Sequence, residues 1–281
     1  MVEEKQREFR FTRKDFDFLR TISNQRTGIV VTDDKYDMFY SRLSRRVRSL
    51  GLRDFAAYCD YVRNDASGTE VLELVNAITT NLTAFFRENH HFDYLVQKVI
   101  PQIKKTNASS RSLKIWSAGC STGEEPYSLA ISLREAGSAL TGWQHGILAT
   151  DIDSNVLATA ARGVYAQDRV KGMSPARLKR WFLRGKGENA GLVRVKPTLQ
   201  ELIQFGQLNL MDEWQMDEPL DVIFCRNVII YFDKETKIRL IEKFARNLKT
   251  GGHLFVGHSE SLNQISQRFE LIGNTVYRKV A

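Results

Sequence analysis

The stretch Leu113-Lys-Ile-Trp-Ser-Ala-Gly-Cys-Ser-Thr-Gly-Glu-Glu-Pro-Tyr-Ser-Leu129 decides the expected fold. It opens with apolar residues at alternate positions, as in a buried strand, and then passes through a glycine-rich turn, Ala118–Gly123. Two acids, Glu124 and Glu125, followed by Pro126 mark the start of a helix. A strand, a glycine turn and a helix in this order are typical of a nucleotide-type ligand site at the head of an open α/β sheet.

The charges of the turn indicate which ligand it binds. A phosphate would lie at the N-terminus of the helix, where this chain has two carboxylates, and no lysine follows Gly123 as a Walker A loop requires. These features disfavour NAD, FAD and ATP. They favour a cationic nucleoside without phosphate, such as S-adenosylmethionine. The alternative is that Glu124 and Glu125 only interact favourably with the helix dipole.

The composition is that of an ordinary globular protein with one large domain or two. The chain has 281 residues, of which 42% are hydrophobic and 26% charged. No apolar run is long enough to span a membrane, and the polar start, Met1–Lys5, does not resemble a signal peptide. Three isolated cysteines fit a reducing cytoplasm, and only His90-His91 are clustered, so we expect no metal site. The net charge of +8 implies an acidic partner, which composition does not identify.

Hydrophobic spacing predicts two domains. Residues 1–90 are expected to form a helical domain, residues 91–112 a connecting helix and polar linker, and residues 113–281 a Rossmann-like, doubly wound and mostly parallel α/β domain. Residues 162–198 interrupt the alternation of strands and helices. The expected fold class is therefore α/β, with a helical N-terminal domain and a small antiparallel β insertion.

The interrupting segment predicts a β-hairpin. Trp181–Arg184 and Leu192–Lys196 are strand-like and flank a long glycine-rich loop. A hairpin with a free edge is able to pair with an extended peptide. The alternative is a decorative subdomain without a partner.

Ligands of such sheets bind at the carboxyl ends of the strands. Asp151 ends the second predicted strand, where an acid is placed to bind ribose hydroxyls; a plain helix cap is the alternative, but Asp153 already fills that role. The helix predicted over Lys234–Lys249 is expected to stop at Gly251-Gly252, before a further strand. The positions selected by this rule are Gly119, Asp151, Asn209, Arg226, Asn227 and His258.

The second predicted helix of the N-terminal domain, Asp33–Leu50, is rich in arginine. From Ser41 to Arg53 the chain has five arginines and no acid. The run is either a solvated helix face or a docking surface for an acidic partner, because guanidinium groups pair with carboxylates in two-point contacts. No recognition-helix pattern or aromatic interleaving follows, so nucleic acid is not favoured. The candidate docking residues are Arg42, Arg45, Arg46 and Arg53.

The segment before the connecting helix places Asn81, Thr83 and Arg87 close together around an aromatic core. One interpretation is a helix start with Thr83 as its cap. The other is a lid or arm that supplies Arg87 to a ligand carboxylate.

Three long motifs together resemble the CheR-type chemotaxis receptor methyltransferases. In chain order they are Ile78-Thr-Thr-Asn-Leu-Thr-Ala-Phe-Phe-Arg-Glu88, Gly119-Cys-Ser-Thr-Gly-Glu-Glu-Pro-Tyr-Ser128 and Cys225-Arg-Asn-Val-Ile-Ile-Tyr-Phe232. The resemblance covers nearly the whole chain, with no departure at the motif positions. It implies an S-adenosylmethionine-dependent protein-glutamate O-methyltransferase. Such an enzyme esterifies glutamate side chains on the cytoplasmic region of transmembrane chemoreceptors, yields S-adenosylhomocysteine and uses no metal.

The resemblance also implies residue roles. Asp151 would bind the ribose, Asn209-Leu210 would lie near adenine, and Asn227-Val228 would lie at the methionine end. The other implied cofactor-binding positions are Asn81, Thr83, Arg87 and Glu124. In this family the insertion is able to dock on a peptide at the receptor C-terminus, and the matching positions here are Gly185, Gly191 and Arg194.

The expected chemistry needs positioning rather than a base. A glutamate acceptor is already ionised at neutral pH, so methyl transfer needs in-line placement and loss of water. We predict that Tyr231 and Arg87 lie near the methyl-transfer centre as orienting groups. The protein is expected to act as a cytoplasmic monomer, without nucleic acid and without inserting into the membrane. The alternatives are a methyltransferase for RNA or a small molecule, and a non-catalytic S-adenosylmethionine-binding signalling adaptor.

Overall fold

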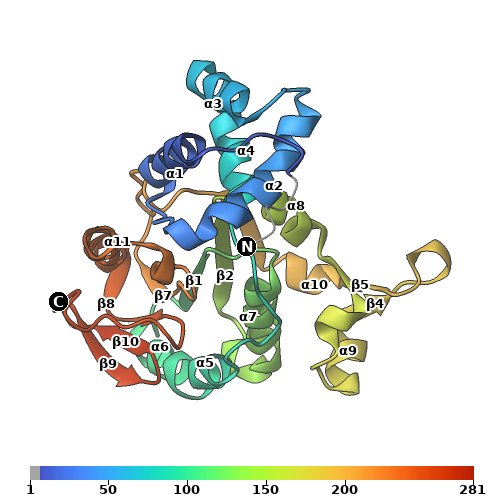
Figure 1. Cartoon of the computed structure of the whole chain (residues 1–281). Coiled ribbons are helices and arrows are strands. Elements are labelled where there is room, and N and C mark those ends of the chain that lie inside the picture. The colour runs from blue at the N-terminus through green and yellow to red at the C-terminus, as the bar shows by residue number, and fades with distance from the viewer. Residues whose placement is uncertain (1–6) are drawn as a thin grey trace. The chain divides into compact units, whose positions relative to one another are not determined.

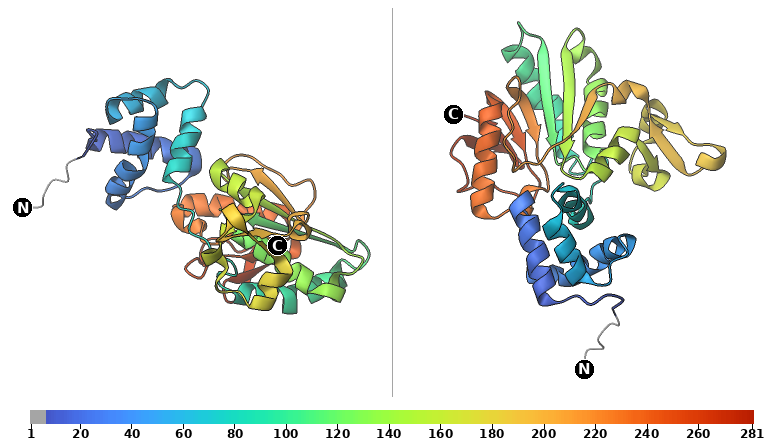
Figure 2. Two further views of the ribbon diagram at one scale, coloured as in Figure 1. Left: turned by 90° about the vertical axis from the view of Figure 1, so that its right-hand side faces the viewer. Right: turned by 90° about the horizontal axis from the view of Figure 1, so that it is seen from above.

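The computed structural model describes residues 7–281, so the polar start of the chain, Met1–Lys5, lies outside the described part. The chain divides into two compact units, whose elements are shown in Figure 1 and Figure 2. The first holds the chain up to Thr80 with Tyr231–Asp233, and the second holds Asn81–Ile230 with Lys234–Ala281. The division falls after Thr80 rather than at the expected residue 90. Within residues 7–281, no helix has the length and apolar character needed to cross a membrane.

Four helices around an aromatic core form the first unit. They are α1 (Arg13–Thr27), α2 (Tyr36–Ser49), α3 (Phe55–Asn64) and α4 (Thr69–Ile78), and a short 3-10 turn, η1 (Asp33–Lys35), precedes α2. A capping box starts α1, because the Thr12 side chain accepts from the backbone N–H of Asp15 and the Asp15 carboxylate accepts from that of Thr12. The fully buried residues of the core are Phe16, Leu19, Phe39, Leu43, Val47, Phe55, Tyr58 and Leu74.

A seven-stranded sheet forms the centre of the second unit, in the order β6-β2-β1-β7-β8-β10-β9. The strands are β1 (Ser112–Ala118), β2 (Gln144–Asp151), β6 (Ile203–Gln207), β7 (Leu220–Phe224), β8 (Leu248–Phe255), β9 (Phe269–Gly273) and β10 (Val276–Lys279). The five strands from β6 to β8 are parallel, and β10 and β9 are antiparallel additions. The strand order reverses between β1 and β7, which is where open α/β sheets bind ligands.

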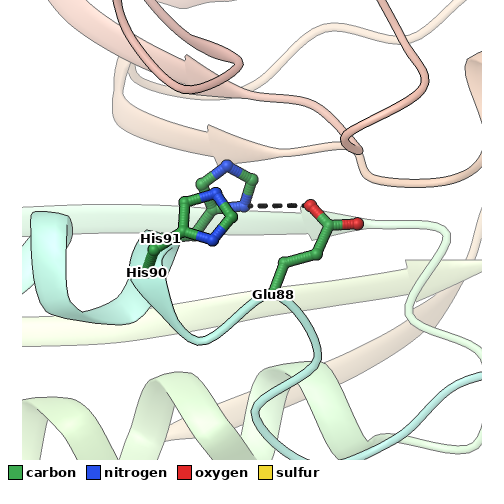
Figure 3. A group of neighbouring side chains, drawn as sticks. All are labelled: Glu88, His90 and His91. Carbon is green, nitrogen blue, oxygen red and sulfur yellow. Dashed lines mark ion pairs between the residues drawn. The ribbon is translucent and has the colours of Figure 1, made fainter.

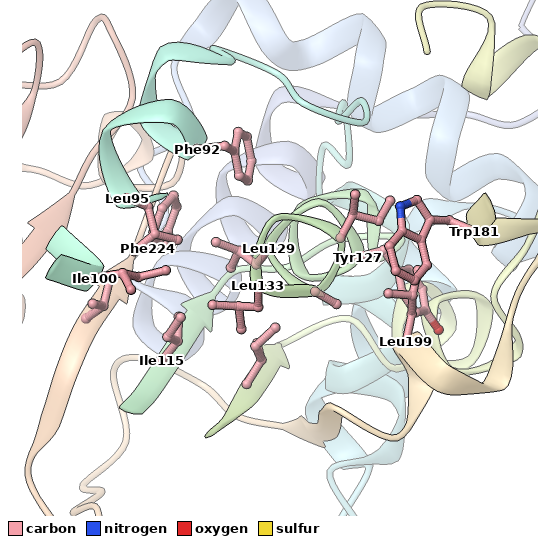
Figure 4. Close-up of a cluster of buried hydrophobic side chains, with 14 of the residues drawn as sticks. Phe92, Leu95, Ile100, Ile115, Tyr127, Leu129, Leu133, Trp181, Leu199 and Phe224 are labelled. Atoms are coloured by element: carbon pink, nitrogen blue, oxygen red, sulfur yellow. The ribbon is translucent and has the colours of Figure 1, made fainter. Parts of the chain in front are cut away.

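Alternating side chains of β1 hold helices on both faces of this sheet. Ile115 belongs to the core that packs against α7 and the α5–α6 region (Figure 4). Trp116 points to the opposite face, where its ring lies 5.4 Å from that of Phe244 in α11. The helices of this unit are α5 (His90–Tyr94), α6 (Ile100–Thr106), α7 (Glu124–Glu135), α8 (Ser154–Arg162), α9 (Pro175–Trp181), α10 (Pro197–Gln200) and α11 (Lys234–Asn247). A π-helical turn, Leu95–Val99, joins α5 to α6.

The insertion forms a separate antiparallel sheet, beside the main sheet in Figure 1. The expected hairpin is present as β4 (Phe182–Arg184) and β5 (Leu192–Val195). A third strand, β3 (Val164–Ala166), pairs with the other edge of β5. It was not expected, because three residues after a helix carry too little alternation to be recognised as a strand.

The prediction that α11 stops at Gly251-Gly252 is wrong. The helix ends at Asn247 and β8 begins at the next residue, so both glycines lie inside the strand. Gly251 has a φ of 81°, and the pairing of β7 with β8 shifts register beside it. A Cβ on Gly252 would lie 2.8 Å from the carbonyl oxygen of Lys249. The glycines therefore allow a bend in the strand rather than a helix end.

Candidate functional site

The carboxyl ends of the parallel strands bring the selected polar residues to one edge of the main sheet. Asp151 is the last residue of β2, and Gly119 directly follows β1. Asn209 follows β6, and Asn227 follows β7. Parallel strands end at the same edge, so residues far apart in the chain become neighbours there.

The glycine turn needs both its backbone freedom and its lack of side chain. Gly119 has a φ of 80°, and a Cβ there would lie 2.5 Å from the Cγ2 of Val228. The turn is held to β2 because the N–H groups of Gly119 and Cys120 both donate to the carbonyl oxygen of Thr150, at 2.8 and 2.9 Å. The structure therefore places Gly119 and Val228, two predicted site residues, in direct contact.

Asp151 is a buried carboxylate fixed by backbone donors. Its Oδ2 accepts from the N–H of Ser121 at 2.7 Å, and its Oδ1 accepts from the N–H of Asp153 at 3.0 Å. Burial raises the pKa of the Asp151 carboxyl, while these hydrogen bonds favour its ionised form. Each oxygen keeps a further lone pair, so the group is able to accept from ribose hydroxyls.

Asp153 fills the role of helix cap, as expected. Its Oδ1 accepts from the N–H of Asn155 at 2.9 Å, and its Oδ2 accepts from the side chain of Asn81 at 2.8 Å. The carbonyl oxygen of Asn81 accepts in turn from the Ser121 hydroxyl at 3.1 Å. These contacts bring Asn81, the first residue of the predicted arm, to the glycine turn.

Glu124 is fully buried and paired with an arginine that sequence reasoning missed. The Nε of Arg169 donates to Glu124 Oε1 at 3.0 Å, and its Nη2 donates to the carbonyl oxygen of Thr83 at 2.8 Å. Arg169 lies in η4 (Gln167–Val170) of the insertion. No spacing in the sequence relates this position to Glu124, so only the fold reveals the pair. The carboxylate oxygens keep lone pairs beyond these bonds, so the group is also able to accept from an ammonium donor.

The predicted arm is a chain of turns rather than a helix start, so Thr83 is not a helix cap. The backbone N–H of Phe86 donates to the Ser128 hydroxyl of α7 at 2.9 Å. Phe85 packs edge-on against the ring of Tyr165, at 5.1 Å. The Arg87 side chain donates through Nη1 to the carbonyl oxygen of Leu82 at 2.8 Å. This outcome favours the arm interpretation.

A second residue that sequence reasoning missed, the acid Glu260, shapes the loop after β7. Its Oε2 accepts from the N–H groups of Asn227 and Gly257, at 2.8 and 2.5 Å, and its Oε1 accepts from that of Ile230 at 3.1 Å. Asn227 has a φ of 60°, a left-handed conformation that these bonds hold in place. The loop that carries Asn227 and Val228 is therefore fixed by one buried carboxylate.

Asn209 and Leu210 also lie at this edge, after β6. The Oδ1 of Asn209 accepts from the N–H of Met211 at 3.0 Å. Leu210 is buried, and its carbonyl oxygen accepts from the indole N–H of Trp214 at 3.2 Å. A fixed amide beside a buried apolar side chain suits the polar edge and flat face of adenine.

Tyr231, a predicted orienting residue, is grouped with the first unit, whereas the predicted cofactor-binding residues all belong to the second. Its carbonyl oxygen accepts from the N–H of Val30 at 2.8 Å, beside an isolated bridge between Ile29 and Phe232. Its expected place near the methyl-transfer centre stays a prediction.

The four arginines predicted for docking differ in their internal contacts. Arg42 donates to the carbonyl oxygens of Ile78 and Thr79, which end α4, at 2.7 and 2.6 Å. Arg46 forms a two-point ion pair with Glu70, whose side chain is only 3% exposed. Arg45 is exposed and forms no ion pair with residues 7–281, and Arg53, with an 85% exposed side chain, has one long contact of 3.5 Å to Asp54.

The three predicted docking positions of the insertion lie on or beside its hairpin. A Cβ on Gly185 would lie 2.0 Å from the carbonyl oxygen of Asn189, so the loop closes only with glycine there. Gly191 has a φ of 85°. Arg194 is exposed in the middle of β5, opposite Leu183 of β4, which is 49% exposed. The sheet therefore presents a mixed apolar and cationic face beside the free edge of β4.

Comparison with known proteins covers almost the whole chain. The family "CheR methyltransferase, all-alpha domain" matches residues 14–79, and "CheR methyltransferase, SAM binding domain" matches residues 81–278. A "Chemotaxis protein methyltransferase" of Escherichia coli is 44% identical over 255 residues, which are 90% of this chain and 86% of that protein. "Chemotaxis protein methyltransferase 2" of Pseudomonas aeruginosa is 45% identical over 271 residues, 96% of this chain and 94% of that protein. The chain belongs to the CheR methyltransferase family.

Membership confirms the resemblance and the fold class predicted from the sequence. The CheR chain is an S-adenosylmethionine-dependent methyltransferase, with a helical domain followed by a cofactor-binding α/β domain. The two matches meet at residues 79 and 81, where the structure also divides. The arm from Asn81 to Glu88 therefore belongs to the cofactor-binding domain.

Proposed function

We propose that this CheR protein transfers the methyl group of S-adenosylmethionine to glutamate side chains in the cytoplasmic region of chemoreceptors, as part of adaptation. The observation that carries the proposal is the agreement of two findings. Relatives named chemotaxis protein methyltransferases match at least 90% of the chain at 44% identity or more. The sheet edge also holds the buried Asp151 carboxylate, which forms no ion pair with residues 7–281 and would repel an anionic ligand.

In this proposal the chain's own residues bind and orient. Glu124 binds the ammonium group, Asp151 binds the ribose hydroxyls, and Arg87 of the arm pairs with the methionine carboxylate. Asn81 and Thr83 fix the arm, and the loops around Gly119, Asn209-Leu210 and Asn227-Val228 complete the cofactor site. The sulfonium supplies an electrophilic methyl group. A glutamate acceptor is ionised at neutral pH, so alignment, worth roughly 7–11 kcal/mol, replaces a general base.

The carboxyl ends of the parallel strands, here called the cofactor edge, bind the cofactor in this proposal. Other surfaces of the protein would select the acceptor. Arg45 and Arg53 are the predicted docking residues of the helical domain with little internal use of their charge, so they are the better candidates there. Gly185, Gly191 and Arg194 would hold a peptide from the receptor C-terminus on the insertion. Tyr231 would orient the acceptor carboxylate. We propose that the enzyme acts as a monomer in the cytoplasm.

Methyl labelling tests the proposal. The protein is incubated with methyl-labelled S-adenosylmethionine and chemoreceptor-containing membranes, and the labelled product is treated with alkali. Release of the label as methanol supports glutamyl methyl esters. A base-stable N-methyl product on RNA or a small molecule would select another acceptor. Tight cofactor binding without any transfer would select a signalling adaptor.

A further inference from the structure

Arg226 carries a buried charge that the roles assigned above do not use. It follows β7 at the cofactor edge, and its side chain is 2% exposed. Nη1 donates to Glu125 Oε2 at 3.1 Å, and Nη2 lies 3.4 Å from Glu88 Oε2. A guanidinium removed from water is stable only where its partners compensate for the lost hydration. Its contacts therefore indicate its role.

On one side Arg226 is fixed to the sheet. Glu125 is in the first turn of α7, and its Oε1 accepts from the Ser117 hydroxyl of β1 at 2.8 Å. Burial raises the pKa of Glu125, and the charge of Arg226 opposes that rise. Glu125 thus joins Arg226 to the glycine turn, one residue beyond the proposed ammonium-binding Glu124.

On the other side Arg226 is fixed to the arm. Its Nη2 donates to the carbonyl oxygen of Arg87 and pairs with Glu88, whose Oε1 accepts from His258 Nδ1 at 2.9 Å. Phe86 and Glu88 both have a φ of 54°, which residues other than glycine adopt at a cost. Tertiary contacts therefore hold the arm in a conformation that its own residues disfavour.

Glu88 of the arm also belongs to a cluster of possible metal ligands. The contact of Arg226 with this cluster supports its role in holding the arm and argues against a metal site. The ligand atoms of Glu88, His90 and His91 lie within 4.8 Å of one another, and His91 Nδ1 is 3.6 Å from Glu88 Oε2 (Figure 3). The guanidinium of Arg226 faces the same carboxylate oxygen and would repel a divalent cation. Burial and the charge of Arg226 lower the pKa of His91 to about 4, so it stays neutral at physiological pH.

We propose that Arg226 is a positioning residue that clamps the arm to the sheet edge and thereby presents the Arg87 guanidinium to the carboxylate of S-adenosylmethionine. Arg226 does not touch the cofactor through its side chain; it acts through the backbone of Arg87 and the carboxylate of Glu88. The inference rests on the proposed role of Arg87. The Arg87 side chain uses Nη1 for the carbonyl oxygen of Leu82 and keeps further donors for a ligand.

Two ligands separate a positioning role from a structural one. S-adenosylhomocysteine has the amino-acid carboxylate, and 5′-methylthioadenosine has only the adenosine part. For Arg226→Gln we expect the Kd of S-adenosylhomocysteine to rise roughly tenfold, as for one lost charged contact, and that of 5′-methylthioadenosine to change less than about twofold. Hydrogen exchange of residues 81–88 should accelerate. An equal loss of affinity for both ligands, or unchanged exchange of the arm, would overturn the clamp.

A matched control is the ion pair between Lys249 of β8 and Asp221, which lies near the start of β7. Lys249 pairs with the buried Asp221 at 2.7 Å, away from the cofactor edge, so Lys249→Gln should leave both affinities unchanged. If Arg226→Gln does not fold, Glu88→Gln keeps the Arg226–Glu125 pair and should give the same change in ligand preference, only smaller. Arg87→Gln tests the proposed function separately. If it leaves S-adenosylhomocysteine affinity unchanged, Arg87 does not bind the carboxylate, whatever the exchange data show.

Discussion

The cofactor edge and the insertion use charge in opposite ways. At the edge, Glu124 and Asp151 are buried and Glu125 is nearly so, and each is bonded to a specific arginine or backbone donor. In the insertion, a group of exposed cationic side chains forms no ion pair with residues 7–281: Lys179, Arg180, Arg184, Lys186 and Arg194. Charges with internal partners build a site, and charges without them are available to a partner.

The insertion accounts for the net positive charge of the protein. Residues 162–198 contain ten Lys and Arg against two Asp and Glu, a net charge of +8 that equals that of the whole chain. The arginine run of α2 is the more conspicuous in the sequence, yet Arg42 and Arg46 of that run are used inside the helical unit. The binding of an acidic receptor segment should therefore depend more on the charges of the insertion than on those of α2.

The largest expected effect is on folding stability, and it separates an arginine of α2 with an internal ion pair from an exposed one. Arg46→Ala leaves the buried Glu70 carboxylate without its cation and should lower the free energy of unfolding by roughly 3–5 kcal/mol. Arg45→Ala, one residue earlier, should change it by less than about 0.5 kcal/mol. Urea denaturation of both variants measures the difference. Equal losses would contradict the division between internal and available charges.

Asp151→Asn tests the buried charge of the cofactor edge. The variant keeps the shape of the side chain but loses its charged hydrogen bonds to ribose, so S-adenosylhomocysteine should bind roughly 100-fold more weakly, about 2.7 kcal/mol. Isothermal titration measures the affinity. Glu270→Gln, which removes an exposed acid on β9, is the control and should bind normally. Normal binding by Asp151→Asn would remove Asp151 from the site.

Charge reversal in the insertion tests whether its exposed positive charges attract the acceptor. Replacing Arg184 and Lys186 by Glu should slow receptor methylation roughly tenfold at low ionic strength, with a smaller effect in high salt. Affinity for S-adenosylhomocysteine should not change. The matched control replaces Lys234 and Arg239 of α11 by Glu, which alters the net charge equally. Equal slowing by both pairs would mean that net charge, not the insertion, guides the acceptor.

The smallest expected effect is the loss of folding stability at low pH that buried histidines of the second unit cause. Burial, with the charge of Arg226, lowers the pKa of His91 to about 4, and burial, with Arg278, does the same for His253. The unfolded chain takes up these protons near pH 6.5, so stability is full above that pH and falls as the pH drops toward 4. From pH 7 to 5.5 each histidine should cost about 1 kcal/mol. His91→Gln should flatten the dependence of Tm on pH; an unchanged profile would contradict the assignment.

The sequence predicts the elements at this sheet edge well because their signals are local. The glycine turn, the acid that ends β2 and the cap Asp153 each lie within a few residues of the element that they define. The partners of those residues are non-local. Arg169 reaches Glu124, and Glu260 reaches Asn227, across stretches whose length carries no periodic signal.

The sequence predicts the use of surface charges less well. The sequence shows that Arg42, Arg45 and Arg46 belong to one arginine-rich helix, but it does not show that Glu70 lies within reach of Arg46. The strand β3 and the glycines within β8 were missed for a related reason, since strand pairing depends on a neighbour distant in the chain.

The most direct test of the account is methyl transfer to receptor glutamates by the wild-type protein and by Asp151→Asn, measured as alkali-released labelled methanol from receptor membranes. We expect labelled methanol with the wild-type protein and a loss of roughly two orders of magnitude with Asp151→Asn at low cofactor concentration. A base-stable product, or a yield that does not depend on Asp151, would contradict it.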